Sequence, residues 1–268
     1  MLNDLWNEWR EVWRQRSLIW VMTRREVAAR HAGTVAGVVW PYAQPLLAVA
    51  AYFLVFDAVF QMRLGPEAPV QRVGAFLVVG ALPWMALGDA LSRGTSSLIE
   101  AGGLLQKNAL PPVLFPVRSV LSSQIVFAPL LLLVAVLYGP VHHFQWPVWV
   151  GMPLLLLAQL LICMLLGYAL AILAAALRDT IQFVAFFLSV GIYLSPILFP
   201  VTLFPEKWRW LLWANPATAL VLGYQTVLLR GEWPAAPVWI ALVLWCLLLV
   251  LVLGALVRRS REHLVDWL

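Results

Sequence analysis

Charged residues are scarce in this sequence. Aspartate, glutamate, lysine and arginine make up 12% of its 268 residues, whereas apolar residues make up 63%. In an average soluble domain roughly a quarter of the residues are charged and about half are apolar. So few charged side chains cannot cover the core of a soluble domain of this length. The composition therefore excludes an ordinary soluble enzyme, and the long apolar runs predict an all-α membrane protein.

Side chains that bind metals or cofactors are also few. The two cysteines, Cys163 and Cys246, lie inside apolar runs, where a small buried hydrophobe is a commoner role than a disulfide or a metal ligand. His142 and His143 are adjacent, so they would not share one helix face, and no carboxylate or cysteine stands beside them. The sequence predicts no metal site and no cofactor bound by this chain.

Two further absences concern the source of energy. The phosphate-binding pattern G-x-x-x-x-G-K-[ST] does not occur in the chain. Ionisable residues are missing from the interiors of the predicted spans, with Asp57 and Asp89 expected at span ends. A proton-driven or sodium-driven carrier and a membrane-embedded enzyme are therefore disfavoured, and any ATP hydrolysis must come from another subunit.

Six apolar stretches are long enough to cross about 30 Å of hydrocarbon as helices. They are residues 33–59, 73–90, 117–138, 149–177, 181–199 and 235–257. An even number of spans places both termini on one side of the membrane. Thirteen of the 18 basic residues fall on that side and five on the other, so the positive-inside rule predicts that both ends are cytoplasmic.

The segment before the first span, residues 1–30, predicts an amphipathic helix. Trp6, Trp9 and Trp13 recur at helical spacing, as in a helix that lies in the headgroup layer, although a helix packed on a partner would show the same pattern. Gly33 and Gly37 have the spacing that lets two membrane helices approach closely, within the chain or between two copies. The rest of the chain, residues 31–268, is predicted to form one membrane domain.

Two connections are longer than turns. Residues 91–116 form a predicted cytoplasmic region with a short helix that ends at Pro111 and Pro112. Residues 200–234 are too apolar for a free loop and too interrupted for a span. Within them Asn215 and Pro216 have the pattern of a helix N-cap followed by proline at the first helical position. We expect two short helices here that dip into the periplasmic side of the membrane.

Aromatic residues form two stripes, one on the first span and one on the fifth. The stripes consist of Tyr42, Phe53, Phe56 and Phe60, and of Phe183, Phe186, Phe187 and Tyr193. At 100° per residue each set clusters on one helix face. Such stripes pack helices together, or line a path along which a sugar polymer slides on aromatic faces. Both interpretations stay open.

Short motifs along almost the whole chain resemble the permease subunits of ABC transporters that export lipid-linked polysaccharides, the Wzm-type O-antigen exporters and their capsule and teichoic-acid relatives. The motifs are Gly37-Val38-Val39-Trp40, Pro45-Leu46, Leu82-Pro83-Trp84, Leu104-Leu105-Gln106-Lys107, Leu110-Pro111, Arg178-Asp179, Ser195-Pro196, Asn215-Pro216, Tyr224 and Leu264-Val265-Asp266. Two departures stand out. The family often has paired lysines at Gln106-Lys107, and an arginine directly after the Phe-Pro that corresponds to Leu110-Pro111.

The resemblance implies a bacterial inner-membrane homodimer that works with two separate ATPase subunits. Those subunits would bind ATP and Mg²⁺, and the cargo would be an undecaprenyl-pyrophosphate-linked polysaccharide, with the C-terminal motif favouring O-antigen. Membrane lipids would be further partners, and nucleic acid would not. The open alternatives are an ABC permease of the same type for a drug or a lipid, and a membrane-embedded enzyme acting on glycans or lipids.

The same resemblance suggests roles for individual residues. Coupling to the ATPase would fall to Glu100, Lys107, Arg178 and Asp179. A periplasmic gate would contain Trp208, Trp210, Trp213, Asn215 and Pro216. By their charge and depth, Arg24, Arg25 and Arg30 are candidates to contact the pyrophosphate, or they anchor the chain on anionic lipid.

Overall fold

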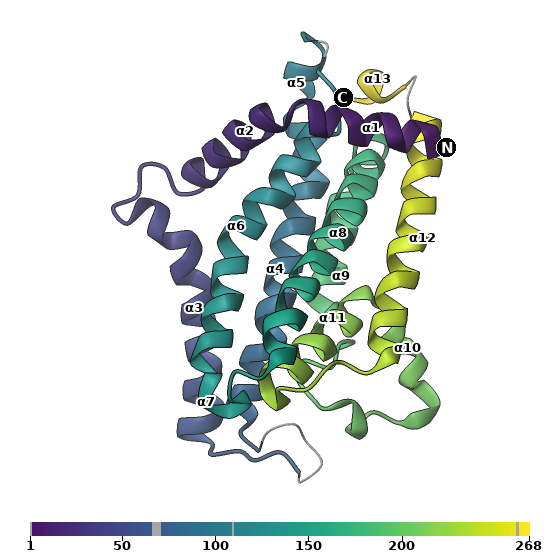
Figure 1. Ribbon diagram of the computed structural model, residues 1–268. Helices are drawn as coiled ribbons and strands as arrows, with labels where there is room; N and C mark the ends of the chain where they lie inside the picture. Colours follow the sequence, from purple (N-terminus) through teal and green to yellow (C-terminus); the bar gives the residue numbers. More distant parts are fainter. Residues whose placement is uncertain (1, 66–70, 109, 261–262) are drawn as a thin grey trace.

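A computed structural model describes residues 2–65, 71–108, 110–260 and 263–268, and within these ranges every regular element is a helix. Five helices are long and apolar enough to cross a membrane (Figure 1). They are α3 (Trp40–Phe53) with its π-helical continuation Leu54–Val59, α4 (Val73–Glu100), α6 (Leu114–Leu137), α8 (Trp146–Ala176) and α12 (Ala236–Ser260). The prediction of an all-α membrane protein is confirmed.

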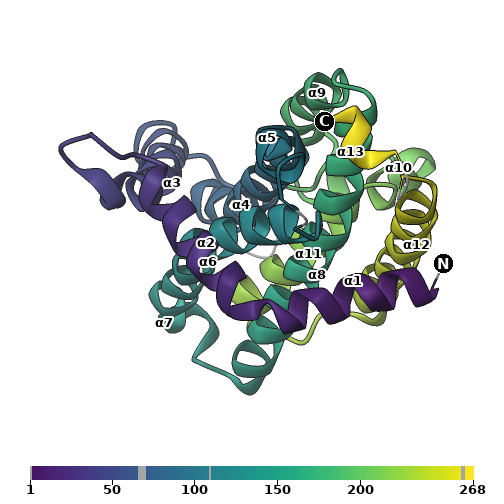
Figure 2. The same cartoon turned by 90° about the horizontal axis from the view of Figure 1, so that it is seen from above.

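Helix α4 forms the centre of the bundle. It packs against α3, α6, α8, α9 and α11, and 83% of its most apolar window is buried. By contrast, only 6% of the corresponding window of α3 is buried, so α3 stands at the edge. Viewed along the helices, α3 and α12 lie at opposite sides of the bundle (Figure 2).

The N-terminal segment lies across one end of the bundle as α1 (Leu2–Arg14) and α2 (Arg16–Ala29) (Figures 1 and 2). Both ends of the described chain lie at this end. The segment predicted to be amphipathic is helical, but it forms two helices. Trp6, Trp9 and Trp13 are all exposed, whereas Leu5 is buried against the bundle. Arg261, one of the basic residues assigned to this side, lies outside the described residues.

The first long helix begins at Trp40 rather than at residue 33. Gly33 and Gly37 have positive φ angles of 84° and 47°, which interrupt a right-handed helix. A Cβ atom at either position would meet nothing within 4 Å. The predicted helix contact within the chain at this motif is therefore wrong. The close approach occurs instead between α4 and α8, where a Cβ on Gly94 would lie 3.2 Å from the Gly167 Cα.

The helix that contains the predicted span 73–90 is longer than that span. Helix α4 continues to Glu100, because no proline or unfavourable glycine geometry stops it and Leu91 and Leu98 are buried in the core. The expected separate helix of the cytoplasmic region shrinks to α5, Gly102–Leu105, ahead of the prolines at 111 and 112. Asp89 therefore lies within a helix, eleven residues before its last residue, and not at its end.

The chain between α8 and α12 contains short helices. Helix α9 spans Thr180–Gly191, twelve residues or about 18 Å, less than a full crossing. After two 3₁₀ turns come α10 (Arg209–Trp213), α11 (Pro216–Gln225) and a π-helical turn, Thr226–Arg230. The remaining short helices are α7 (Gly139–His142) and α13 (Leu264–Trp267).

The predicted pair of short helices in 200–234 is thus present. Asn215 is the N-cap of α11: its side chain accepts a hydrogen bond from the Ala217 N–H at 3.0 Å, and Pro216 follows at the first helical position. Most of α11 is buried, packed on α4, α8 and α12.

Candidate functional site

A partly buried charged cluster joins α2, α4 and α6. Arg30 follows the last residue of α2, and its guanidinium lies 3.0 Å from an Asp89 carboxylate oxygen on α4. Arg93, one turn further along α4, contacts the other Asp89 oxygen at 3.0 Å. The Arg30 side chain is only 3% exposed and also donates to Ser122 on α6 at 2.8 Å. Ser123 donates to Asp89, so three helices meet at one carboxylate.

A second ion pair lies on the same face of α6. The Arg118 Nε lies 3.3 Å from Glu26 of α2, and Ser119 and Ser122 donate to the Glu26 carboxylate at 3.2 and 2.9 Å. Burial lowers the pKa of the Arg30 guanidinium, and the Asp89 carboxylate opposes that effect. The two pairs fix α2 to both α4 and α6.

A cleft of about 470 Å³, here called the α3–α4 cleft, opens beside this cluster. Arg30, Asp89 and Arg93 contribute to its charged wall, and Trp84 and Leu188 to its apolar wall. A second cleft, the α8–α9 cleft, has a volume of about 530 Å³ and is also lined by Trp84 and Leu188. The two clefts therefore adjoin along α4, on either side of α9.

The α8–α9 cleft reaches the short helices before α12. Asn215 and Pro216, two of the predicted gate residues, line it together with Leu211. Trp208 and Trp210 are exposed, and Trp213 is half-buried with its carbonyl accepting from the Trp245 indole at 3.2 Å. The predicted gate residues are thus close along the chain, but only two of them line a cleft.

The aromatic stripes are largely exposed on the described chain. Phe53, Phe60, Phe183, Phe186, Phe187 and Tyr193 are exposed, and Tyr42 and Phe56 are half-buried. Of these, Phe187 lines the α8–α9 cleft. Tyr193 lies beyond the end of α9, and the π-helical turn shifts Phe56 relative to the regular helix that precedes it. Their role as a pathway wall stays a prediction.

The arginines predicted to contact pyrophosphate and the residues predicted to couple to the ATPase lie near the end of the bundle that holds both termini. Arg24 and Arg25 are exposed on α2, in contrast to the buried Arg30. Glu100 is exposed and accepts a hydrogen bond from Ser96 at 2.6 Å. The other three candidates are exposed in turns, Lys107 after α5 and Arg178 and Asp179 between α8 and α9. Their functional roles also stay predictions.

Hydrogen bonds from polar side chains connect α11, α8 and α4 inside the bundle. The Tyr224 hydroxyl on α11 donates to the Gln159 side-chain oxygen on α8 at 2.8 Å. Gln159 in turn donates to the Pro83 carbonyl on α4 at 3.0 Å, and Gln225 donates to the Pro196 carbonyl at 2.8 Å. These bonds hold α11 in place between α4 and α8.

The Tyr224→Phe variant should therefore lose about 1 kcal/mol of stability, because the Gln159 oxygen would be left buried without a donor. The apparent melting temperature of the purified protein measures the loss. Tyr193→Phe is the matched control, since the Tyr193 side chain is exposed. Equal melting temperatures for the two variants would contradict the bridging role of Tyr224.

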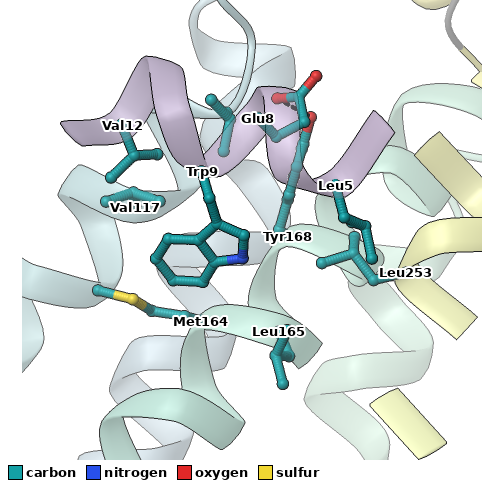
Figure 3. A pocket seen from close by; sticks show the side chains of 10 residues that line it. Leu5, Glu8, Trp9, Val12, Val117, Met164, Leu165, Tyr168 and Leu253 are labelled. Carbon is teal, nitrogen blue, oxygen red and sulfur yellow. Dashed lines mark hydrogen bonds between the residues drawn. The ribbon is translucent and has the colours of Figure 1, made fainter. Parts of the chain in front are cut away.

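Helix α1 is seated on the ends of α6, α8 and α12 (Figure 3). Leu5, Trp9 and Val12, spaced four and three residues apart, point from α1 toward these helices. The Tyr168 hydroxyl of α8 donates to Glu8 at 3.3 Å. The cavity that remains between α1 and these helices has a volume of only about 20 Å³, so α1 packs closely on its own chain.

Residues 17–229 match the ABC-2 type transporter family. The chain belongs to this family. It is a membrane permease and not an enzyme, in agreement with the expectation from its sequence.

The relatives of this chain include permeases named for O-antigen export. The O-antigen export system permease protein RfbA of Myxococcus xanthus is 29% identical over 264 residues, which cover 96% of this chain and 97% of that protein. A protein of the same name from Klebsiella pneumoniae is 25% identical over 217 residues, 80% of this chain and 81% of the relative. The resemblance to the Wzm-type permeases is thereby confirmed.

Several residues of the charged cluster were not among the sequence-predicted site residues. Glu26, Asp89, Ser122 and Ser123 come from three segments that are far apart in the sequence. One feature of the sequence pointed to the pair: an acidic residue within an apolar run, such as Asp89, needs a partner of opposite charge. Arg30 was predicted only to bind a headgroup.

Proposed function

We propose that this chain is the channel-forming permease of an ABC exporter for lipid-linked polysaccharide, with undecaprenyl-pyrophosphate-linked O-antigen as the cargo. The observation that carries the proposal is the near end-to-end similarity to an O-antigen export permease. The adjoining clefts beside α4 and the shortage of charge within the long helices suit a passive conduit whose energy comes from outside the chain.

In this proposal the chain works as a homodimer with two ATPase subunits that bind ATP and Mg²⁺. Both termini and the coupling residues face the cytoplasm of the bacterial inner membrane, as the thirteen-to-five distribution of basic residues favours. Glu100, Lys107, Arg178 and Asp179 meet the ATPase. The aromatic stripes on α3 and α9 line the sugar path.

The proposal also includes a sixth crossing and a periplasmic gate. Helix α9 and the turns after it follow α4: Leu188 lies near Gly88, Trp84 near Gly191, and Ile197 near Gly80. This course supports a crossing completed by non-helical turns, although α9 alone is short. Helices α10 and α11 then re-enter the periplasmic leaflet as the gate, a role that the half-buried, cleft-lining N-terminus of α11 supports.

Arg24, Arg25 and Arg30 are proposed contacts for the pyrophosphate at the cytoplasmic opening. Arg24 and Arg25 are free to meet a headgroup on the surface, whereas Arg30 would share it with Asp89 beside the α3–α4 cleft. Single replacement of each arginine by glutamine tests this role. Unchanged export at normal membrane levels of all three variants would remove the headgroup role.

Deletion of the gene tests the function as a whole. We expect surface polysaccharide to disappear and lipid-linked polymer to accumulate in the cytoplasm, with both restored by the intact gene. Purification of the tagged chain should bring down an ATPase with a phosphate-binding loop in equal copy number. Normal surface glycan without intracellular polymer would overturn the proposal.

A further inference from the structure

A large cleft at the end of the bundle opposite the termini separates α3 from α4 and α6. This α3–α6 cleft has a volume of about 1040 Å³, just above the range of about 300–1,000 Å³ that is usual for ligand sites. The C-terminal end of α6 and helix α7 lie at this end (Figure 1). The cleft also accounts for the exposure of α3, because the helix is held away from the core along its inner face.

The walls of the α3–α6 cleft are apolar. One face of α3 supplies Leu46, Val49, Ala50 and Phe53, at spacings of three, one and three residues, followed by Leu54. The opposite wall consists of Ala75, Val78 and Leu137. From Leu46 to Leu54 the wall extends about 12 Å along the helix. An acyl chain can lie along such a surface.

The rim of the cleft carries two arginines. Arg63 and Arg72 are paired across an antiparallel bridge, supported by a 2.8 Å hydrogen bond from the Leu64 N–H to the Gln71 carbonyl. Both arginine side chains are exposed, and neither forms an ion pair with a carboxylate among the described residues. Two like charges held side by side favour an anion between them.

One carboxylate lies near this pair and sets the net charge. Asp57 shares a hollow of about 240 Å³ with Arg63 and Arg72. One of its oxygens accepts a hydrogen bond from the Gly74 N–H at 2.8 Å, and the other is buried without a partner. The three side chains together carry one net positive charge, which matches the single negative charge of a phosphodiester.

We propose that the α3–α6 cleft binds an anionic phospholipid of the surrounding bilayer, with an acyl chain along α3 and the phosphate between Arg63 and Arg72. Arginine pairs bind phosphate oxygens through directed, charge-assisted hydrogen bonds, and Tyr138 at the same rim adds a hydroxyl. The lipid fills the space between α3 and the core.

This lipid site lies apart from the α3–α4 and α8–α9 clefts, and Phe53 is the one residue of the aromatic stripes in its described lining. The residues of α3 that line the α3–α4 cleft are Pro41, Gln44 and Pro45. At 100° per residue their centre lies about 140° around α3 from the centre of Leu46, Val49, Ala50 and Phe53. A bilayer lipid can therefore occupy the α3–α6 cleft whether or not the chain exports polysaccharide, and the inference does not rest on the proposed function.

Native mass spectrometry of the full chain tests the site, with phosphatidylglycerol as the anionic probe and phosphatidylethanolamine as the zwitterionic one. We expect the native protein to retain phosphatidylglycerol in preference to phosphatidylethanolamine. The Arg63→Gln/Arg72→Gln variant should bind phosphatidylglycerol about 30-fold more weakly, at about one kcal/mol per arginine converted to affinity. Its preference between the two lipids should disappear.

Matched controls separate this site from general charge and from misfolding. Lys207→Gln/Arg230→Gln removes the same charge from exposed residues outside the lining and should change binding less than about threefold. Ala50→Trp fills the cleft and should abolish retention of both lipids. Ala51→Trp, one residue along and outside the lining, should retain phosphatidylglycerol as the native chain does.

Three outcomes would overturn the proposal. The first is equal phosphatidylglycerol binding by the two double-glutamine variants, and the second is equal retention of both lipids by the native protein. The third is a native dimer that carries no lipid while its monomer does, which would assign the cleft to a second copy of the chain.

Discussion

The Asp89→Asn variant is expected to lose about 2–3 kcal/mol of stability, less than the roughly 3–5 kcal/mol typical of a fully buried ion pair because the Asp89 side chain is 24% exposed. Asparagine preserves the shape of the side chain but removes its charge. The Arg30 guanidinium, 3% exposed and 3.0 Å from Asp89, would then be buried without a counter-charge on α4. The apparent melting temperature of the purified protein and its yield from membranes should both fall.

Two further variants give this prediction its controls. Arg93→Gln removes the other partner of the same carboxylate, but the Arg93 side chain is 37% exposed, so the loss should stay below about 1 kcal/mol. The Arg30→Met/Asp89→Leu variant replaces the buried pair with apolar side chains and should recover most of the lost stability. Similar small losses for Asp89→Asn and Arg93→Gln would show that the buried pair does not stabilise the fold.

The buried pair also connects two parts of the permease mechanically. Helix α2 carries the exposed Arg24 and Arg25, and Arg30 and Glu26 tie it to α4 and α6. Helix α4 runs from this junction past Trp84, which lines both clefts. A displacement of α2 would therefore move the wall of the α3–α4 cleft.

Features that depend on a short stretch of sequence were predictable. The spans predicted at 117–138, 149–177 and 235–257 differ from α6, α8 and α12 by three residues or fewer at each end. Their length and apolar composition suffice to define them. The start of α11 also depends on adjacent residues alone. The Asn215 side chain accepts a hydrogen bond from the first turn, and Pro216 has no N–H that needs a partner at the first helical position.

Features that depend on contacts between distant segments were not predictable. The continuation of α4 beyond residue 90 follows from the burial of Leu91 and Leu98 against other helices. The Arg30–Asp89 pair joins residues that are 59 positions apart, and the span predicted over 73–90 gave no sign that Asp89 has a partner on α2. The glycine motif failed for a similar reason: its spacing fits a helix, but the chain at 33–37 is not one.

The glycines that do bring helices together, Gly94 and Gly167, lie in separate spans and show no motif in the sequence. The Gly94→Val variant should therefore lose about 3 kcal/mol of stability. Its Cβ would lie 3.2 Å from the Gly167 Cα, and because backbone atoms have no other rotamer to adopt, α4 and α8 would have to separate. The apparent melting temperature measures the effect.

Gly88→Val is the matched control, on the same helix and with the same change in helix propensity. A Cβ at Gly88 meets only a Leu188 methyl carbon, at 3.9 Å, and the side chain would extend toward the α3–α4 cleft. This variant should therefore melt within about 1 kcal/mol of the native protein. Equal melting temperatures for Gly94→Val and Gly88→Val would contradict this prediction. The contact of α4 with α8 would then not depend on the absence of a side chain at Gly94, and the two helices would tolerate a wider separation than these distances imply.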